Sequence, residues 1–271
     1  MDIQTLLKKS KREIDSLDAE ILLEFVSGIS REKFLEDPGH KVVQEVEDKF
    51  WPLVKKRKKT PLAYLIRKKE FFLREYYVDE RVLIPRPETE ILVEEVIKNF
   101  QQEVIIDIGT GSGAIAISLK LALPESQVIA VDISSGALDV ARKNASRLGA
   151  EIIFRSSDLL SFLKDEKRIS SPLLLVANLP YLSPEEITSS LQAEPKLALD
   201  GGPDGLDLYR SLFREIISLQ KNFTFHKIFC EINPHQAEKF SLAAKKIFPE
   251  AQVDFILDFS GQVRVGKVIF K

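Results

Sequence analysis

The stretch that most constrains the fold is a glycine-rich turn between an apolar run and an apolar helix. Residues 104–108, Val-Ile-Ile-Asp-Ile, predict a buried strand, and Gly-Thr-Gly-Ser-Gly-Ala follows at 109–114. Residues 115–121 then predict a helix. A strand, a glycine turn and a helix in this order are typical of α/β folds in which the backbone of the turn passes close to a nucleotide. The sequence therefore predicts a Rossmann-like domain with a ligand at this turn.

Acidic residues follow the next two predicted strands. Asp132 ends the first, and Asp158 and Leu159 come after the second, at 152–154. At the end of a strand, Asp132 is placed to accept both hydroxyls of a ribose. Asp158 would meet an exocyclic amine and Leu159 would cover an adenine; alternatively, Asp158 merely caps a helix at 159–163. The turn and the acids together suit either NAD or S-adenosylmethionine.

A further apolar run, 173–177, ends in Asn178-Leu179-Pro180-Tyr181. Ligands bind at the carboxyl ends of strands in open α/β sheets, so these four residues are placed to face a substrate. Asn178 would offer its side-chain oxygen, and Leu179 its backbone carbonyl, to the two N–H bonds of a planar NH2 group. Tyr181 would lie against that plane and favour a sulfonium-borne methyl group. This pattern favours a methyltransferase over a nicotinamide enzyme.

Such a site would act mainly by positioning. An amide nitrogen is a poor nucleophile, and in-line geometry at a near-attack distance removes much of the barrier. No general base is needed before attack, because the proton becomes acidic only once the nitrogen is alkylated. Taken alone, the Asn178–Tyr181 stretch could also be a proline-containing turn without chemistry. Because the glycine turn and the two acids occur in the same chain, a substrate site is favoured over a turn without chemistry.

Residues 1–62 predict a small bundle of amphipathic helices. Its apolar stripes are Ile3, Leu6 and Leu7; Leu17, Ile21 and Phe25; and Val43, Val46, Phe50 and Leu53. Ser16 is the expected N-cap of the second helix, and Gly28 is its expected end. Nothing in this segment carries obvious chemistry. Its expected role is to recognise a partner or to cover the active site.

Two pairs of strands are expected outside the parallel sheet. Residues 63–84 predict a β-hairpin linker with strands at 65–72 and 76–83, both rich in aromatic and β-branched residues. Residues 253–258 and 263–270 predict a closing antiparallel pair. A terminal hairpin of this kind is similar to the end of the S-adenosylmethionine-dependent methyltransferase fold and unlike a plain dinucleotide domain.

A stiff connector leads from the linker into the sheet. Pro85 and Pro87 keep it extended, and Pro87 suits the first turn of a helix that continues to Phe100. Arg86 and Glu88 are the charged groups that the connector fixes, and they are candidates for contact with a substrate. Alternatively, Arg86 pairs with a nearby carboxylate on the surface.

Charge and cysteine content narrow the class of protein. The net charge of −2 argues against wholesale coating of nucleic acid. The basic run 55–59 is expected to be a solvated helix end, with a patch for an acidic partner as the alternative. Cys230 is the only cysteine and is expected in the core, and His40, His226 and His235 show no metal-ligand spacing. With no signal peptide and no membrane span expected, a cytoplasmic protein is predicted.

Over nearly all 271 residues, the chain closely resembles the HemK/PrmC family, the release factor glutamine methyltransferases. The motifs that carry the resemblance are Val82-Leu-Ile-Pro-Arg-Pro-Glu-Thr-Glu90, Asp107-Ile-Gly-Thr-Gly-Ser-Gly-Ala-Ile-Ala116, Asn178-Leu-Pro-Tyr181, Glu194-Pro-Lys-Leu-Ala-Leu-Asp-Gly-Gly-Pro-Asp-Gly-Leu-Asp207, Glu231-Ile232 with Gln236, and Asp258 with Arg264. The glycine turn alone is weak evidence. The Pro-Arg-Pro-Glu-Thr-Glu and Gly-Gly-x-Asp-Gly-Leu stretches are much more specific.

The resemblance implies methyl transfer from S-adenosylmethionine to the side-chain amide nitrogen (N5) of the glutamine in the Gly-Gly-Gln motif of class I peptide chain release factors. It implies a helical domain, 1–62, that docks the release factor, and a methyltransferase domain, 85–271, with a mostly parallel seven-stranded sheet. A monomer without direct nucleic-acid binding is expected.

Site residues follow from the resemblance and from the patterns above. The expected cofactor-binding residues are Gly109, Thr110, Gly111, Ser112, Gly113, Asp132, Asp158, Leu159 and Asn178. The expected catalytic and substrate-binding residues are Asn178, Leu179, Pro180 and Tyr181, with Arg86 and Glu88 also contacting the substrate. No metal site is expected.

One departure from the family pattern keeps alternatives open. The family usually has Asn-Pro-Pro-Tyr, whereas position 179 here is leucine, as is more familiar from ribosomal-RNA adenine dimethyltransferases. Leucine supplies the same backbone carbonyl but loses the fixed φ of proline and gains an N–H. The alternatives are an adenine-N6 methyltransferase acting on RNA and a non-catalytic regulator that binds S-adenosylmethionine.

Overall fold

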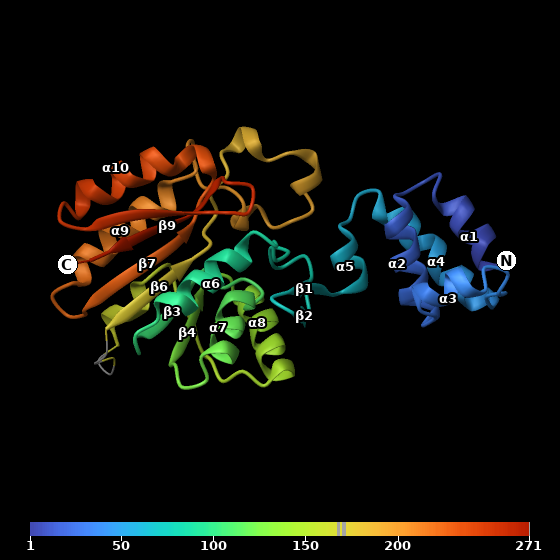
Figure 1. The fold of residues 1–271 in the computed structure, drawn as a ribbon, viewed down its shortest axis with the longest axis horizontal. Coiled ribbons are helices and arrows are strands. Elements are labelled where there is room, and N and C mark those ends of the chain that lie inside the picture. Colours follow the sequence, from blue (N-terminus) through green and yellow to red (C-terminus); the bar gives the residue numbers. More distant parts are fainter. Residues whose placement is uncertain (167–168, 170–171, 271) are drawn as a thin grey trace. The chain divides into compact units, whose positions relative to one another are not determined.

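The computed structural model describes residues 1–166, 169 and 172–270, and the chain divides into two compact units, Met1–Lys68 and Lys69–Lys271 (Figure 1). Each unit has its own hydrophobic core. The helix that follows residue 61 belongs to the first unit, and the β-hairpin belongs to the second.

The first unit is the expected helical bundle. Its helices are α1 (Ile3–Ser10), α2 (Ser16–Ser27), α3 (Arg31–Glu36), α4 (Gln44–Arg57) and α5 (Leu62–Ile66). They pack around one buried cluster made of Ile3, Leu6, Leu22, Leu23, Phe34, Phe50 and Val54. Each helix contributes one apolar face, so the core forms only when the helices associate.

The face that α2 buries differs from the predicted one. Ala19, Leu22 and Leu23 are fully buried, whereas Leu17 and Phe25 of the expected stripe are about half exposed, at 48% and 47%. Both sets have helical spacing, because α2 is apolar on more than one side. The period alone therefore predicts the helix but does not select the face that packs.

Asp15, rather than the expected Ser16, caps α2. Its carboxylate accepts a hydrogen bond from the Leu17 N–H at 2.8 Å, and an acidic group at this end is favoured by the helix dipole. The end of the helix is confirmed: Gly28 has a φ of 69°, a left-handed conformation that glycine adopts without strain.

The basic run 55–59 lies at the end of α4, which confirms the prediction of a helix end. Lys55, Lys56 and Arg57 occupy the last turn, where cations oppose the negative end of the helix dipole. The Arg57 guanidinium also donates to Asp18 at 2.7 Å, and Lys58 pairs with Glu13. This run therefore has partners within its own unit.

The larger unit contains the predicted seven-stranded sheet, ordered β5-β4-β3-β6-β7-β9-β8. Its strands are β3 (Val104–Ile108), β4 (Val128–Asp132), β5 (Ile153–Ser156), β6 (Leu173–Ala177), β7 (Phe225–Glu231), β8 (Gln252–Leu257) and β9 (Val263–Ile269). The first five strands in that order are parallel, and β9 pairs antiparallel with both of its neighbours, β7 and β8. The predicted mostly parallel sheet and its closing hairpin are confirmed.

Helices cover both faces of this sheet (Figure 1). They are α6 (Thr89–Asn99), α7 (Ala114–Ala122), α8 (Ser135–Leu148), α9 (Asp207–Leu219) and α10 (Ala237–Ile247). Apolar side chains of α6, α7 and α8 share one core cluster with the sheet, and those of α9 and α10 share the other. Because both faces are covered, the central strands are almost wholly apolar.

The predicted linker hairpin is shorter than expected. Its strands are only β1 (Lys69–Phe71) and β2 (Arg74–Tyr76), joined by a two-residue turn at Phe72 and Leu73. Residue 65 lies in a helix instead. Strand β2 does not continue because the next N–H, of Tyr77, bonds to the side chain of Asn144 at 2.7 Å rather than to a neighbouring strand.

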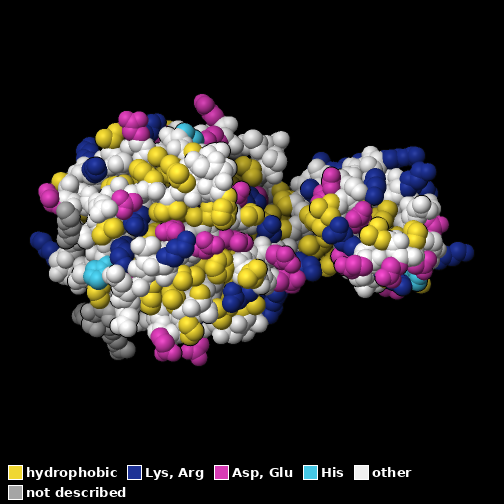
Figure 2. All heavy atoms as spheres, in the orientation of Figure 1, with side chains coloured by type: hydrophobic (Ala, Val, Ile, Leu, Met, Phe, Trp, Pro, Cys, Tyr) yellow, Lys and Arg dark blue, Asp and Glu magenta, His cyan; other side chains and the backbone are white. Residues whose placement is uncertain are grey.

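Other predictions for the core and surface can be compared with the structure. Cys230 is a free, fully buried residue of β7, which confirms a packing role. Basic and acidic side chains intermingle over the face that Figure 2 shows. Within the part of the chain that is described, no helix has the length and apolar character needed to cross a bilayer.

Candidate active site

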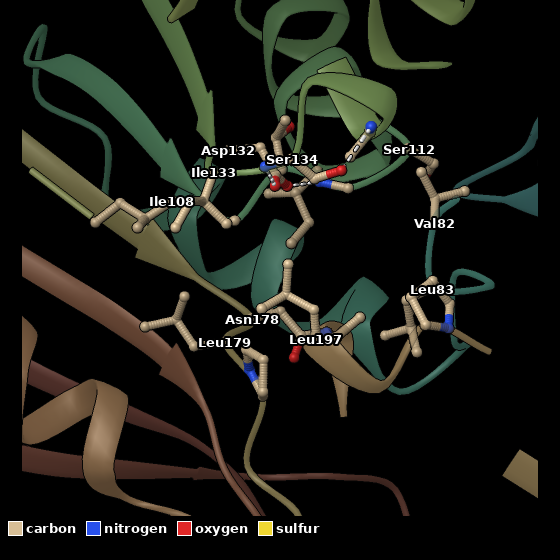
Figure 3. A pocket seen from close by; sticks show the side chains of 18 of the residues that line it. Val82, Leu83, Ile108, Ser112, Asp132, Ile133, Ser134, Asn178, Leu179 and Leu197 are labelled. Atoms are coloured by element: carbon tan, nitrogen blue, oxygen red, sulfur yellow. Dashed lines mark hydrogen bonds between the residues drawn. The ribbon is translucent and has the colours of Figure 1, made fainter. Parts of the chain in front are cut away.

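The main cavity opens at the carboxyl ends of β3, β4 and β6 (Figure 3). The residues that line it from the sheet side come from the ends of strands and the turns after them. They are Ile108 to Ser112, Asp132 to Ser134, Ser157 to Leu159 and Asn178 to Pro180. Two further segments enclose it. One contributes Arg81, Val82, Leu83, Pro85 and Arg86, and the other is a loop that includes Pro195, Leu197 and Ala198. The cavity lies where ligands bind in this architecture.

The glycine turn has a backbone that other residues would strain. Gly109, Gly111 and Gly113 have φ values of 72°, 54° and 81°. A Cβ atom at Gly109 would also lie 3.1 Å from the Leu179 side chain, and one at Gly113 would lie 3.0 Å from Ile117. Glycine is thus required both for the path of the backbone and for close packing against α7.

Asp132 holds this turn and faces the cavity. Its Oδ2 accepts the Gly111 N–H at 2.9 Å, and its Oδ1 accepts the Ser134 N–H at 2.8 Å (Figure 3). Burial raises the pKa of the carboxyl group, and these backbone hydrogen bonds partly offset the rise. Each oxygen retains a lone pair, so the carboxylate can still accept the two hydroxyls of a ribose.

Asp107 lies beneath the turn and was not among the predicted site residues. The Thr110 hydroxyl donates to its Oδ2 at 2.6 Å, and the Ala116 N–H donates to the same oxygen at 3.2 Å. Burial raises its pKa to about 7. Among the described residues, Oδ1 has no hydrogen-bond partner. The signal in the sequence is a charged residue inside an otherwise apolar strand.

Asp158 and Leu159 line the cavity beside Asp132. Leu159 is buried and has a φ of 45°, which turns the chain back over the cavity. The alternative role for Asp158, capping a helix, is wrong. The short 3₁₀ helix that follows, Ser161–Lys164, has Leu160 at its N-cap and no side-chain cap.

The side-chain amide of Asn178 is oriented by a hydrogen bond to another residue of the chain. Its Nδ2 donates to Oγ1 of Thr89 at 3.1 Å. Within the described part of the chain, its Oδ1 accepts no hydrogen bond and is the acceptor left for a ligand. Thr89 is buried at the start of α6, so the connector that precedes this helix places the partner of Asn178.

Leu179 uses the N–H that a proline would lack. That group donates to the Tyr209 hydroxyl at 3.3 Å, and Tyr209 in turn donates to the backbone carbonyl of Glu231. The same hydroxyl lies 3.4 Å from the carbonyl of Ala177. Tyr209 therefore ties the ends of β6 and β7 to the turn that carries Asn178 to Tyr181, here called the tetrad.

Tyr181 lines a second cavity rather than the main one. Leu83, Arg86, Asn178, Leu179 and Ala198 line both cavities, so the two adjoin. The Tyr181 hydroxyl donates to Oε1 of Glu231 at 3.0 Å. Tyr181 and Asn178 thus line the same second cavity, which adjoins the main one.

Arg86 has a partner that its sequence neighbourhood does not reveal. It forms an ion pair with Glu194, whose side chain is only 3% exposed, and Glu194 also accepts the Ile84 N–H at 3.0 Å. The alternative for Arg86, an ion pair with a carboxylate, is therefore what the structure shows, except that the carboxylate is buried and not on the surface. Glu88, also predicted to contact a substrate, is exposed and lines neither cavity.

The glycine cluster at 201–205 packs against the tetrad instead of forming an open surface loop. A Cβ atom at Gly201 would lie 2.4 Å from the carbonyl oxygen of Pro180, and one at Gly205 would lie 2.0 Å from that of Tyr181. Gln236 also donates to the Tyr181 carbonyl, at 2.7 Å. The glycine cluster and Gln236 therefore restrict the position of the tetrad backbone.

Several residues that hold the site carried no assigned role at the level of the sequence: Thr89, Glu194, Tyr209, Glu231 and Gln236. Most lie inside the motifs of the family resemblance, but Tyr209 does not. Nothing in the sequence around Tyr209 gave a reason to place it at the sheet. Only the packing of α9 on the sheet brings its hydroxyl to the end of β6.

Comparison with known proteins agrees with this arrangement. Residues 87–192 match the family model of the methyltransferase small domain, and residues 2–66 match that of the PrmC N-terminal domain. A release factor glutamine methyltransferase of Bacillus cereus is 36% identical over 265 residues, which cover 93% of this chain and 91% of that protein. One of Moorella thermoacetica is 40% identical and covers 72% and 71%.

Solved structures show the same fold at low identity. A 16S rRNA N2 G1207 methyltransferase of T. thermophilus, in complex with AdoMet and guanosine, is 15% identical, with a TM-score of 0.54. The match covers 75% of this chain and 50% of that one. A methyltransferase of Pyrococcus furiosus is also 15% identical, with a TM-score of 0.53, covering 81% and 98%.

The cavity suits S-adenosylmethionine, since a glycine turn with positive φ angles and the half-buried carboxylate of Asp132 both line it. The protein is an S-adenosylmethionine-dependent methyltransferase. With relatives this similar across most of its length, the chain belongs to the release factor glutamine methyltransferase family.

Proposed function

We propose that the protein methylates the side-chain amide nitrogen (N5) of the glutamine in the Gly-Gly-Gln motif of class I peptide chain release factors. The observation that carries the proposal is the orientation of Asn178. Its NH2 group is engaged by Thr89, so its oxygen is the group available to a ligand. An acceptor at this position suits a substrate that presents N–H bonds.

Asn178 and Leu179 together would position the reacting nitrogen. The side-chain oxygen of Asn178 and the backbone carbonyl of Leu179 would accept the two N–H bonds of the glutamine amide. Tyr181 would lie against the plane of that amide from the second cavity. Pro180 fixes the backbone between them. Positioning of this kind removes the entropic part of the barrier before the reaction begins.

The glycine turn, from Gly109 to Gly113, and Asp132 would hold the cofactor, with Asp158 and Leu159 at its adenine. When bound, S-adenosylmethionine supplies a methyl group on a sulfonium sulfur, and the N–C bond forms as the S–C bond breaks. The amide proton becomes acidic only then and leaves to water. The residues of the chain therefore need to bind and align, not to remove a proton beforehand.

The remaining assignments complete the proposal. The helical unit would dock the release factor, because it has its own core and carries no chemistry of its own. Arg86, held by Glu194 at the border of both cavities, would contact the substrate backbone near the glutamine. Glu88, at the N-terminus of α6, would meet the substrate outside the cavities. We place the protein in the cytoplasm, where release factors act.

The test is methyl transfer to a purified class I release factor from labelled S-adenosylmethionine. Label should appear on the wild-type factor and not on one in which the glutamine of Gly-Gly-Gln is replaced by alanine. Label on both factors, or on neither, would overturn the proposal. Transfer to ribosomal RNA but not to protein would instead support an adenine methyltransferase, the alternative that Leu179 raises.

A non-catalytic regulator would give a third pattern. It would bind S-adenosylmethionine but transfer no methyl group to either substrate. Replacement of Asn178 by alanine would then leave its cellular function intact, whereas the proposed enzyme would lose function.

A further inference from the structure

Tyr209 binds the backbone of the tetrad but lines neither of the two cavities. It lies in the first turn of α9 and is 1% exposed. Its ring packs edge-on against the ring of Phe240, with the two centroids 5.8 Å apart, so the position of the phenol is set by the core. Because Tyr209 faces neither cavity, it can act on a ligand there only through the groups that it binds.

The single proton of the Tyr209 hydroxyl has two acceptors within reach. The carbonyl oxygen of Glu231 lies 2.5 Å from the hydroxyl oxygen, whereas that of Ala177 lies 3.4 Å away. The proton goes to Glu231, because hydrogen bonds between oxygens weaken beyond about 3 Å. The lone pairs of the hydroxyl then remain to accept the Leu179 N–H, at 3.3 Å. The hydroxyl thus donates to the end of β7 and accepts from the tetrad.

The Leu179 N–H depends on this hydroxyl. Leu179 is only 4% exposed, and a buried N–H without a partner costs free energy, so the hydrogen bond to Tyr209 is kept in the folded protein. A proline at position 179 would carry no N–H and would have a fixed φ. Leucine leaves φ free to vary. The hydrogen bond therefore supplies a constraint on the backbone that the residue type at 179 does not.

The Leu179 carbonyl lies between two restricted parts of the backbone. On its amino side, the N–H of the same residue is bonded to Tyr209. On its carboxyl side, the Pro180 carbonyl packs so closely on Gly201 that a Cβ there would lie 2.4 Å from the carbonyl oxygen. The peptide plane between these two points has little freedom to rotate while both contacts hold. This plane carries the carbonyl that is assigned above as the second acceptor for the substrate amide.

We infer that Tyr209 is a positioning residue for the proposed reaction: by binding the Leu179 N–H, its hydroxyl directs the Leu179 carbonyl toward the substrate amide. The inference rests on the proposed function for the identity of the substrate. It adds that the two acceptors of the site are oriented by different helices. Thr89 of α6 orients the side chain of Asn178, and Tyr209 of α9 orients the backbone of Leu179. Without the hydroxyl, the reacting nitrogen would lose one of its two fixed acceptors.

The test places Tyr209→Phe, which removes the hydroxyl and keeps the ring, in three backgrounds of the full chain: wild type, Leu179→Ala and Leu179→Pro. Alanine removes the leucine side chain but keeps the N–H, whereas proline removes both and fixes φ. We expect Tyr209→Phe to lower kcat roughly tenfold in the wild-type and alanine backgrounds, with the affinity for S-adenosylmethionine unchanged. In the proline background the loss should be less than about threefold, because no N–H is left to hold.

Tyr76→Phe is the matched control for the loss of a buried hydroxyl. Tyr76 is fully buried in the same unit, and its hydroxyl is bonded to that of Ser118 at 2.9 Å. Tyr76→Phe should leave kcat within about twofold of the parent in all three backgrounds. An equal loss of kcat from Tyr209→Phe in all three backgrounds, or no loss in any of them, would overturn the inference.

Backbone hydrogen exchange tests the same contact without a methyl acceptor, and also if Leu179→Pro fails to fold. The Leu179 amide is followed by NMR relative to the Leu175 amide of β6, which reports global unfolding. Its relative rate should rise roughly tenfold or more in Tyr209→Phe and stay unchanged in Tyr76→Phe. Equal relative rates in the wild type and both variants would overturn the inference even if a release factor is methylated. Faster exchange in Tyr209→Phe alone would support it, and a lack of methylation would then overturn only the proposed function.

Discussion

The two ends of the proposed active site, one assigned above to the cofactor and the other to the substrate, are built differently. The cofactor end is formed by backbone: a glycine turn with three positive φ angles, fixed by two acids, Asp107 and Asp132. The substrate end is formed by side chains that other side chains orient through hydrogen bonds. Asn178 is bonded to Thr89, and Tyr181 is bonded to Glu231. The first depends on residues close in the sequence, whereas the second depends on partners 89 and 50 residues away. Local geometry suffices to hold a cofactor, but orientation of a substrate needs the whole fold.

The largest effect should come from crowding the backbone of the substrate end. In Gly205→Ala the new Cβ would lie 2.0 Å from the Tyr181 carbonyl oxygen, so the tetrad must move. We expect kcat to fall roughly a hundredfold or more, with cofactor affinity much less affected. Gly261→Ala is the control, because its φ is also positive, 81°, but nothing lies within 4 Å. Equal losses of kcat in the two variants would mean that strain, not displacement of the tetrad, is responsible.

Removing the oriented amide should have the next largest effect. Asn178→Ala should lower kcat by roughly a hundredfold, since a preorganised acceptor at the reacting nitrogen acts mainly in the transition state. Steady-state turnover and calorimetric titration with S-adenosylmethionine measure the two quantities separately. A loss of cofactor affinity as large as the loss of kcat would contradict the separation of the two ends.

The cofactor end should respond in the opposite way. Asp132→Ala removes the acceptor for the ribose hydroxyls and should weaken S-adenosylmethionine binding by roughly thirtyfold to a hundredfold, while kcat at saturating cofactor falls much less. Asp139→Ala provides the control, because Asp139 is an exposed acid on α8 with a 65% exposed side chain. If kcat fell as far as affinity, Asp132 would have a role beyond binding.

Leu179 joins the two ends and should give the smallest change in activity. Its side chain packs against the glycine turn, and it lines both cavities. Leu179→Ala should lower kcat and cofactor affinity by similar, several-fold factors, and the free energy of unfolding by about 2–5 kcal/mol. Leu175 lies in the preceding strand and is fully buried. Leu175→Ala should lower the free energy of unfolding by a similar amount but leave kcat and the cofactor affinity near their wild-type values. An effect of Leu179→Ala on kcat alone would assign it to the substrate end.

The same contrast explains which features the sequence could predict. The parallel strands, the glycine turn and the place of Asp132 at the end of a strand were predicted correctly, because apolar runs and glycine spacing are local signals. The partners of Asn178 and Tyr181 were missed, because nothing near position 178 specifies Thr89 or Glu231. For the same reason the buried partner of Arg86 was missed: Glu194 reaches it only through tertiary packing.

Errors in the secondary structure also have a physical cause. Residues 77–83 have a composition suited to a strand, but a strand needs a neighbour, and Asn144 takes the N–H of Tyr77 instead. In α2, two apolar stripes compete, and only association with the other helices selects Leu22 and Leu23 for the core. Local propensity is overridden in both cases by a tertiary partner.

The order of strands in the sheet has a consequence for biosynthesis. Strands β3, β4 and β5 are consecutive in the chain and lie side by side, so the cofactor end can form while later residues are still being translated. The substrate end requires Tyr209 and Glu231, and β9 must pair with β7 beside them. We therefore expect a nascent chain to acquire the means to bind a methyl donor well before it can align an acceptor, so that incomplete chains remain inactive.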